Sequence, residues 1–223
     1  MSRDLSELEF RVRDAGSLSE RERGELSGLF EMNYRRADPA FLAKSLTKLR
    51  CVATATRGDA AVGFALAETR VMDLPRLPEQ VVSLAGIGCV APEFRRRGVL
   101  GELQRRAVTA NPVPERPRRL ICGRMAHPAA LRIIGRLPTA VPKAGVRPTA
   151  WQQAVGEAVA AAYGVHGFDP ETFVCLGDGT PIGYPMLELD VEPHEWELFE
   201  AVDRDRGDAL LAIAWAPDAP PDW

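Results

Sequence analysis

A nearly unbroken run of apolar and small residues occupies positions 81–90 of this 223-residue chain. A strand that carries apolar side chains toward both faces belongs inside a sheet that is covered on both sides. The run also contains Gly86 and Gly88, and glycines inside a strand indicate a bulge or the close approach of a ligand or another backbone. The sequence therefore predicts a central strand with a partner lying against it.

Several signals follow directly after this predicted strand. Pro92 comes first, then three successive arginines at 95–97, and Gly98 opens a helical pattern over residues 98–109. The first N–H groups of a helix lack intrahelical acceptors, and the helix dipole adds partial positive charge there. Glycine lets an anion reach the backbone, and guanidinium groups suit phosphate oxygens. This junction is predicted to bind a diphosphate group.

The rest of the chain mixes helix and strand patterns. Capping residues with helical apolar spacing predict helices, and alternating or continuous apolar runs predict strands. We expect helices over residues 20–34, 39–49, 98–109, 128–134, 149–163 and 194–202, and strands over residues 8–12, 51–56, 60–71, 81–90, 120–122, 172–176 and 210–215. Residues 74–78 are predicted to form a loop because they contain two prolines. The order of elements predicts a mixed α/β fold.

Composition excludes several classes of protein. The net charge of −3 argues against a protein whose main partner is nucleic acid. No run of 18 apolar residues occurs, and residues 1–4 open no signal-peptide segment, so we expect a cytoplasmic protein without a membrane partner. The four cysteines are scattered, so we expect neither a metal site nor disulfides, but buried thiols at Cys51, Cys89, Cys122 and Cys175.

Charge is distributed unevenly along the chain. Residues 94–119 contain eight arginines and two glutamates, whereas residues 187–208 contain nine acidic residues and two arginines. A solvated face is the ordinary interpretation of such an acidic run. The alternative hypothesis is that the stretch from Glu188 to Asp208 attracts a cationic substrate.

The segment Val90-Ala91-Pro92-Glu93-Phe94-Arg95-Arg96-Arg97-Gly98 resembles the acyl-coenzyme A motif of the GNAT superfamily of N-acetyltransferases. In that family [Arg/Gln]-x-x-Gly-x-[Gly/Ala] follows a strand and a V-x-P-x-[Phe/Tyr] stretch. The order of elements over residues 1–135 is similar as well. Leu100 departs from the pattern at its last position, with Gly101 one place later, which predicts an altered turn into the helix.

The resemblance implies an architecture and a domain organisation. It implies a mixed, mostly antiparallel central sheet that is splayed at the fourth and fifth strands and flanked by helices. Residues 1–135 would form the GNAT core with the acyl-CoA site. Residues 136–216 would complete the same sheet with extra helices, and residues 217–223 are expected to form a frayed tail.

The resemblance also implies a coenzyme site. Main-chain amides over residues 96–101 would hold the pyrophosphate, and main-chain groups of Cys89 and Val90 would meet the pantetheine arm. The candidate coenzyme-binding residues are Cys89, Val90, Arg95, Arg96, Arg97, Gly98, Val99, Leu100 and Gly101. Acetyl-CoA is the expected co-substrate and an amine of a small molecule or protein the expected acceptor, without a metal.

Candidate catalytic residues are less well defined. Many family members use a carboxylate base on the fourth strand, but residues 81–90 contain none, which leaves Glu68 and Glu79. Either is also interpretable as a solvated surface acid. The tyrosine proton donor of many members is replaced by Ile134. His127 stands where the family has an asparagine, and it can be a titrating group or a helix-capping, packed side chain.

The function implied by the resemblance is an N-acetyltransferase that works by direct transfer, with a homodimer as the family-level expectation. Two alternatives stay open because the strand carboxylate and the tyrosine are missing. One is a non-catalytic acyl-CoA-binding module, which would bind the coenzyme without releasing thiol. The other is an acyl-CoA decarboxylase on the same fold, which would release carbon dioxide without an acceptor.

Overall fold

The structure is a computed structural model that describes residues 5–179, 184–185 and 191–223. The chain forms two compact units. We call Met1–Thr69 with Ala85–Pro112 the N-terminal unit, and Arg70–Leu84 with Val113–Trp223 the C-terminal unit. The domain organisation with a boundary at residue 135 stays a prediction.

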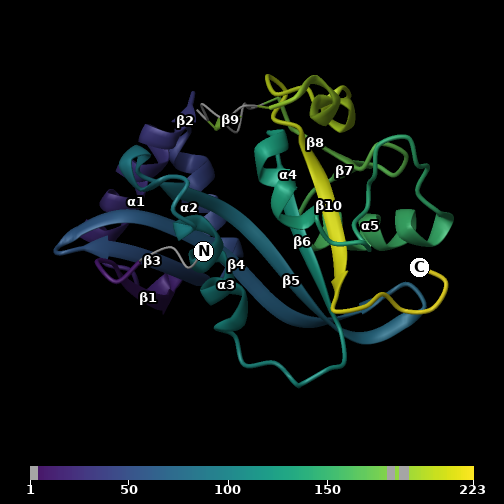
Figure 1. The fold of residues 1–223 in the computed structure, drawn as a ribbon, viewed down its shortest axis with the longest axis horizontal. Helices are drawn as coiled ribbons and strands as arrows, with labels where there is room; N and C mark the ends of the chain where they lie inside the picture. Colours follow the sequence, from purple (N-terminus) through teal and green to yellow (C-terminus); the bar gives the residue numbers. More distant parts are fainter. Residues whose placement is uncertain (1–4, 180–183, 186–190) are drawn as a thin grey trace. The chain divides into compact units, whose positions relative to one another are not determined.

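Eight strands form a mostly antiparallel sheet in the order β1-β3-β4-β5-β6-β10-β8-β7, flanked by helices (Figure 1). The strands are β1 (Glu9–Asp14), β3 (Cys51–Arg57), β4 (Ala60–Leu74), β5 (Leu77–Val90), β6 (Arg119–Met125), β7 (Gly167–Asp169), β8 (Val174–Leu176) and β10 (Ala209–Ala216). Two-residue strands β2 (Tyr34–Arg35) and β9 (Tyr184–Pro185) lie outside this sheet. The mixed α/β fold class is confirmed, while the splay stays a prediction.

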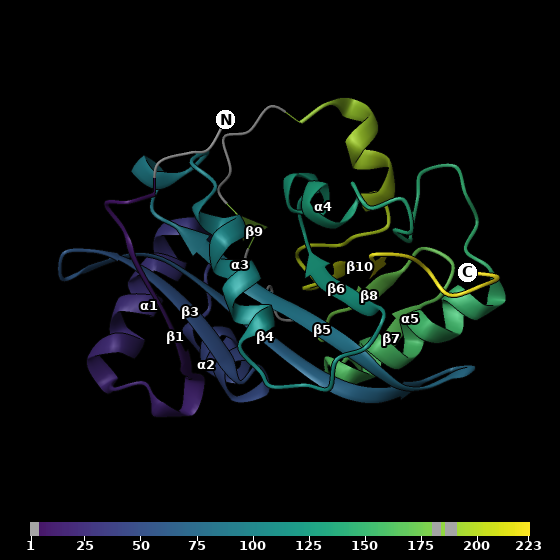
Figure 2. The ribbon, with the colours of Figure 1, turned by 60° about the horizontal axis from the view of Figure 1, so that its bottom comes forward.

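The N-terminal unit contains α1 (Glu20–Asn33), α2 (Pro39–Lys48) and α3 (Val99–Thr109), with 3-10 turns η1 (Ala15–Ser17) and η2 (Pro92–Phe94). Ser19 and Glu22 form the predicted capping box that starts α1. Figure 2 shows α3 alongside the strands of this unit. Fully buried aromatic side chains, Phe30, Phe64 and Phe94, fill its core.

The C-terminal unit contains α4 (Pro128–Ile134), α5 (Ala150–Ala162) and the 3-10 helix η3 (Pro193–Phe199). Thr149 and Gln152 form the predicted capping box of α5. At the other end of this helix, the Tyr163 hydroxyl donates to the Cys122 carbonyl oxygen of β6 at 3.1 Å. Strand β6 pairs antiparallel with β10 from Met125↔Leu210 to Arg119↔Ala216.

The predicted helices and strands form, except that the helix expected over residues 194–202 is the 3-10 helix η3, which ends at Phe199. The short strands β2, β7 and β9 were not predicted. Two other segments also differ from their predictions. Residues 74–78 are a tight turn and not a loop, because β4 continues to Leu74 and β5 begins at Leu77. Arg76 takes the left-handed conformation that this short connection requires, with φ of 68°.

The C-terminal segment, residues 217–223, also differs from its prediction. Trp223 packs edge-to-face on Trp151 and Trp215, with ring centroids 5.4 and 5.9 Å apart, so the expected fraying is wrong.

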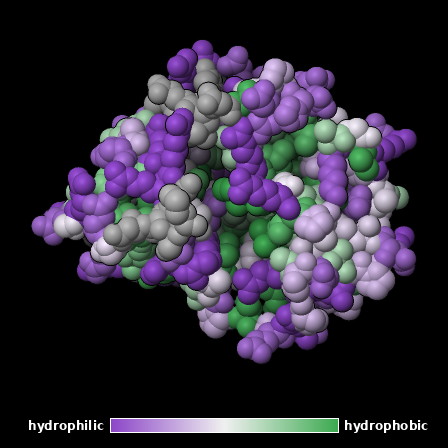
Figure 3. Space-filling model, in the orientation of Figure 1, coloured by the Kyte–Doolittle hydropathy of each residue, from purple (hydrophilic) through white to green (hydrophobic). Residues whose placement is uncertain are grey.

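On the face in Figure 3, hydrophobic residues gather in places, with hydrophilic residues around them. The exposed large apolar residues are Val12, Met32, Val71, Ile133, Val146 and Leu176, which belong to different elements and loops. Within the described residues, no helix has both the length and the apolar character to cross a bilayer. The homodimer and the cytoplasmic location stay predictions.

Candidate functional site

The loop between β5 and α3 is built by two left-handed residues and one buried aromatic anchor. Phe94 in η2 is 1% exposed and fixes the middle of the loop in the core. Arg96 has φ of 62°, and Gly98, the N-cap of α3, has φ of 87°. Glycine adopts this conformation without strain, so Gly98 lets the chain turn sharply into the helix.

Five consecutive main-chain N–H groups at the start of α3 have no acceptor among the residues that the structure describes. The N–H of Arg95 donates to the Pro92 carbonyl oxygen, and the N–H of Glu102 donates to that of Gly98. Between them, no hydrogen bond from the main-chain N–H exists within the described part of the chain for Arg97, Gly98, Val99, Leu100 and Gly101. Donors of this kind at a helix start attract an anion.

The arginines of this loop differ in what their side chains contact. Arg95 donates through Nε to the Val90 carbonyl oxygen at 3.2 Å, and through Nη2 to Oδ1 of buried Asn33 at 3.1 Å. Its guanidinium therefore fastens the loop to β5 and α1, and its role as a phosphate ligand stays a prediction. Arg97 pairs with Glu7 at 2.8 Å and lies over the Phe94 ring, and Arg96 is exposed.

The two glycines of β5 face leucine side chains. A Cβ atom at Gly86 would lie 2.1 Å from Cδ1 of Leu49, and one at Gly88 would lie 2.6 Å from Cδ1 of Leu100. At these two positions leucine side chains approach the strand closely, and the approach of a ligand to its main chain stays a prediction. Gly88 also provides the space for Leu100, the residue that departs from the family pattern.

Cys89 and Tyr34 are neutral groups beside the loop. Cys89 is 1% exposed, and burial raises the pKa of its thiol well above the ordinary value although Arg95 opposes this. A thiol in this state is not an activated nucleophile. Burial, with a smaller contribution from Cys89, also raises the pKa of the Tyr34 phenol far above its ordinary value. The sequence did not predict Tyr34, because only the fold brings the end of α1 toward β5.

The structure places the two candidate carboxylates in different units. Glu68 lies on β4 in the N-terminal unit, half-buried. Val62, six residues earlier on β4, accepts from the Ala91 N–H, so Glu68 stands about 20 Å along the strand from the loop. Glu79 lies in the C-terminal unit on the exposed β4–β5 hairpin, 3.4 Å from Arg116. Its environment matches the solvated surface acid of the alternative interpretation.

His127 caps α4 in the C-terminal unit. Its side chain is buried, and its Nδ1 accepts from the Ala129 N–H at 3.1 Å. Burial lowers the pKa of His127, and the cationic Arg204 and Arg132 lower it further, while Glu195 raises it. The assigned tautomer is therefore neutral, with a proton on Nε2 and Nδ1 occupied. These contacts favour the capping interpretation over a general base acting through Nδ1.

Part of the acidic run has structural partners. Glu188 lies outside the described residues. Glu195 accepts two hydrogen bonds from Arg132 at 2.6 and 2.5 Å, which lower its pKa to about 2. Asp208 is fully buried and accepts from Arg206 and from the N–H groups of Gly177 and Asp203. Attraction of a cationic acceptor stays a hypothesis for the remaining acids.

The structure bears on two expectations from the sequence, the buried thiols and the absence of a metal site. All four cysteines are buried and free. Among the described residues, no group of three or more His, Cys, Asp or Glu side chains is placed to hold a metal ion.

No protein-family model matches this sequence, and no curated protein matches it. Solved acetyltransferases are similar in fold. Arabidopsis thaliana NAA60 with acetyl-CoA is 15% identical, with a TM-score of 0.41 and coverage of 59% of this chain and 86% of that one. A Brucella melitensis GNAT family acetyltransferase with acetyl-CoA is 12% identical, with a TM-score of 0.37. The match covers 51% of this chain and 75% of that one. Aminoglycoside N-acetyltransferase AAC(6')-Iy with CoA is 21% identical, with a TM-score of 0.35. The match covers 46% of this chain and 68% of that one.

Proposed function

We propose that this protein is an acyl-CoA-dependent N-acyltransferase that moves an acetyl group from acetyl-CoA to an amine of a small molecule or protein. The observation that carries this proposal is the run of five main-chain N–H groups from Arg97 to Gly101, which begins within the motif and lacks acceptors in the described part of the chain. A diphosphate accepts charge-assisted hydrogen bonds from such donors. The dipole of α3 and the half-exposed guanidinium of Arg97 add favourable charge.

Direct transfer in a ternary complex fits the state of the thiol best. The acceptor amine attacks the thioester carbonyl carbon, an oxyanion forms, the C–S bond breaks, and the departing thiolate takes up a proton. A covalent acyl-enzyme would need a thiolate, and the pKa of Cys89 is raised by burial. In this proposal main-chain groups of Cys89 and Val90 hold the pantetheine arm. Tyr34, which is protonated before the reaction, is the candidate donor: it gives its phenol proton to the thiolate, and the phenolate then takes up a proton from solvent. Glu68 is the candidate base.

The proposal is tested by removing one amide from the start of α3. Gly101 is the third residue of this helix, and proline is tolerated in the first turn. Gly101→Pro deletes one N–H, so we expect coenzyme A to bind roughly 10- to 100-fold more weakly in isothermal titration. Gly101→Ala is the matched control, because it keeps the N–H and its Cβ meets no atom within 4 Å.

The outcomes of this titration are distinct. A wild-type protein that does not bind coenzyme A, or a proline variant that binds as tightly as the alanine variant, would refute the proposed loop. Melting temperatures of both variants show whether the fold is intact.

The non-catalytic acyl-CoA-binding module is the second candidate. It is favoured by Ile134, which is buried and occupies the position of the family's tyrosine. A panel of amines with acetyl-CoA separates the two, since only the enzyme releases thiol faster with an acceptor. Tyr34→Phe should slow that release if Tyr34 is the proton donor. Release of carbon dioxide from malonyl-CoA without an acceptor would instead support a decarboxylase.

A further inference from the structure

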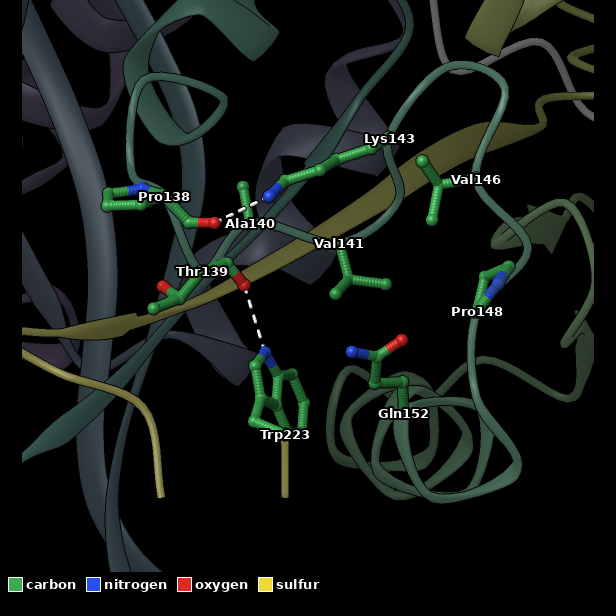
Figure 4. A pocket seen from close by; sticks show the side chains of 9 residues that line it. All are labelled: Pro138, Thr139, Ala140, Val141, Lys143, Val146, Pro148, Gln152 and Trp223. Carbon is green, nitrogen blue, oxygen red and sulfur yellow. Dashed lines mark hydrogen bonds between the residues drawn. The ribbon is translucent and has the colours of Figure 1, made fainter. Parts of the chain in front are cut away.

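A small pocket opens in the C-terminal unit, and its lining includes no residue of the proposed coenzyme loop. It is formed by the loop that follows α4, the first turn of α5 and the indole of Trp223 (Figure 4). Its walls are mostly apolar, with Val141, Val146 and Pro148 beside the indole. The cavity volume is about 140 Å³, close to the engineered apolar cavity of about 150 Å³ that binds benzene. One six-membered ring therefore fits.

The aromatic wall of this pocket is held by other residues. The Trp223 Nε1 donates to the Thr139 carbonyl oxygen at 3.0 Å, and its ring packs edge-to-face on Trp151 and Trp215. Trp151 is in turn fixed by a hydrogen bond from its Nε1 to the Pro75 carbonyl oxygen at 2.7 Å. A ring that enters the pocket meets a preformed aromatic surface, so little ordering has to accompany binding.

The same pocket carries positive charge and hydrogen-bond donors. Lys143 lines the pocket, and its ammonium is turned toward Pro138, where it donates to the carbonyl oxygen at 2.5 Å (Figure 4). Among the residues that the structure describes, no carboxylate pairs with this ammonium. An ammonium has three donors, so two stay available. Gln152 also lines the pocket, and its Oε1 is used by the Thr149 N–H at 2.9 Å. The amide of Gln152 is thereby oriented, and its Nε2 is a further donor.

We propose that this pocket is a binding site for a small aromatic carboxylate. The ring of the ligand packs against Trp223 and the apolar wall, and its carboxylate accepts hydrogen bonds from Lys143 and Gln152. The existing bond from Lys143 to Pro138 is kept. This site is separate from the proposed coenzyme loop and does not depend on the acyltransferase function.

Isothermal titration of the full chain with benzoate, without coenzyme, tests the proposal. We expect saturable binding with a dissociation constant in the millimolar range, as ligand efficiency allows for so small a molecule. Benzamide, which lacks the charge, and acetate, which lacks the ring, should each bind at least tenfold more weakly. Lys143→Met keeps the aliphatic stem and removes the charge, so it should weaken benzoate binding roughly 10- to 100-fold.

Two further variants separate a specific site from general attraction. Lys44→Met changes one exposed lysine on α2 and should leave benzoate binding unchanged. Val146→Phe fills the pocket from a position that is 60% exposed, so it should weaken binding while the melting temperature is kept. The proposal is overturned if benzoate shows no saturable binding, if acetate binds equally well, or if Lys143→Met binds like the wild type.

Discussion

Arg95 illustrates how a single side chain prepares the candidate loop. Its guanidinium satisfies the Val90 carbonyl oxygen and the buried Asn33 side chain, and Asn33 in turn donates to the Leu29 carbonyl oxygen at 2.7 Å. Breaking such a buried network leaves polar groups without partners, which costs about 1–3 kcal/mol for each group. The network therefore holds the loop in one shape, so that the amides of Arg97 to Gly101 are oriented before any ligand arrives.

His127 provides a prediction at the residue scale. Its pKa is lowered from 6.5 in the folded protein, mainly by burial and then by Arg204 and Arg132. The unfolded chain therefore binds a proton more readily, and stability falls as the pH drops below the unfolded pKa of about 6.5. His127→Asn keeps a capping side chain without a titrating group, so its free energy of unfolding should fall less between pH 7.5 and pH 5.5.

Urea unfolding of both proteins across this pH range measures the effect. His127→Ala is the companion variant, because it also loses the cap and should be less stable than His127→Asn by about 1 kcal/mol at every pH. Equal pH slopes for the wild type and His127→Asn would contradict the assignment.

At the scale of elements, the start of a helix depends on residues close together in the sequence, whereas the packing of a helix depends on residues far away in the sequence. The capping boxes of α1 and α5 form as predicted because each joins residues only three positions apart. The glycines inside helices look alike in the sequence, yet their surroundings differ. A Cβ at Gly28 in α1 would meet no atom within 4 Å, whereas one at Gly156 in α5 would lie 2.8 Å from Cε1 of Phe173.

These two glycines predict opposite effects of the same substitution. Gly28→Ala should stabilise the protein by about 0.5–1 kcal/mol, because alanine loses less backbone entropy in a helix. Gly156→Ala has the same gain but forces its methyl group against the packed rings of Phe173 and Phe168, so a net loss of about 1–3 kcal/mol is expected. Urea unfolding at neutral pH distinguishes them, and a stabilising Gly156→Ala would contradict the packing described.

At the scale of the whole molecule, long-range aromatic contacts order the end of the described chain. Trp223 contacts Trp151 and Trp215, which lie on α5 and β10. Trp215 is fully buried, so the cluster joins the tail to the core of the C-terminal unit. Proline-rich composition alone predicted a frayed segment, and these contacts outweigh it.

Trp223→Ala tests the contribution of this cluster. Removing the indole exposes apolar surface on Trp151 and Trp215, so we expect a loss of about 2 kcal/mol and a melting temperature lower by roughly 4–8 °C. Asp218→Ala in the same segment is the control, since Asp218 is exposed and should change stability by less than about 0.5 kcal/mol. If the tail contributes nothing to stability, the two variants should have equal melting temperatures.

The sequence by itself determined the kind and order of the elements and the position of the candidate loop. Capping boxes, apolar periodicity and the junction of β5, Gly98 and α3 are local signals, readable because their interactions join residues close together in the chain. Only the tertiary structure decided that Arg95 binds Asn33 and that leucines fill the space at Gly86 and Gly88. It alone brought Trp223 to Trp151 beside the pocket. These contacts join residues far apart in sequence, and their geometry exists only once the chain has folded.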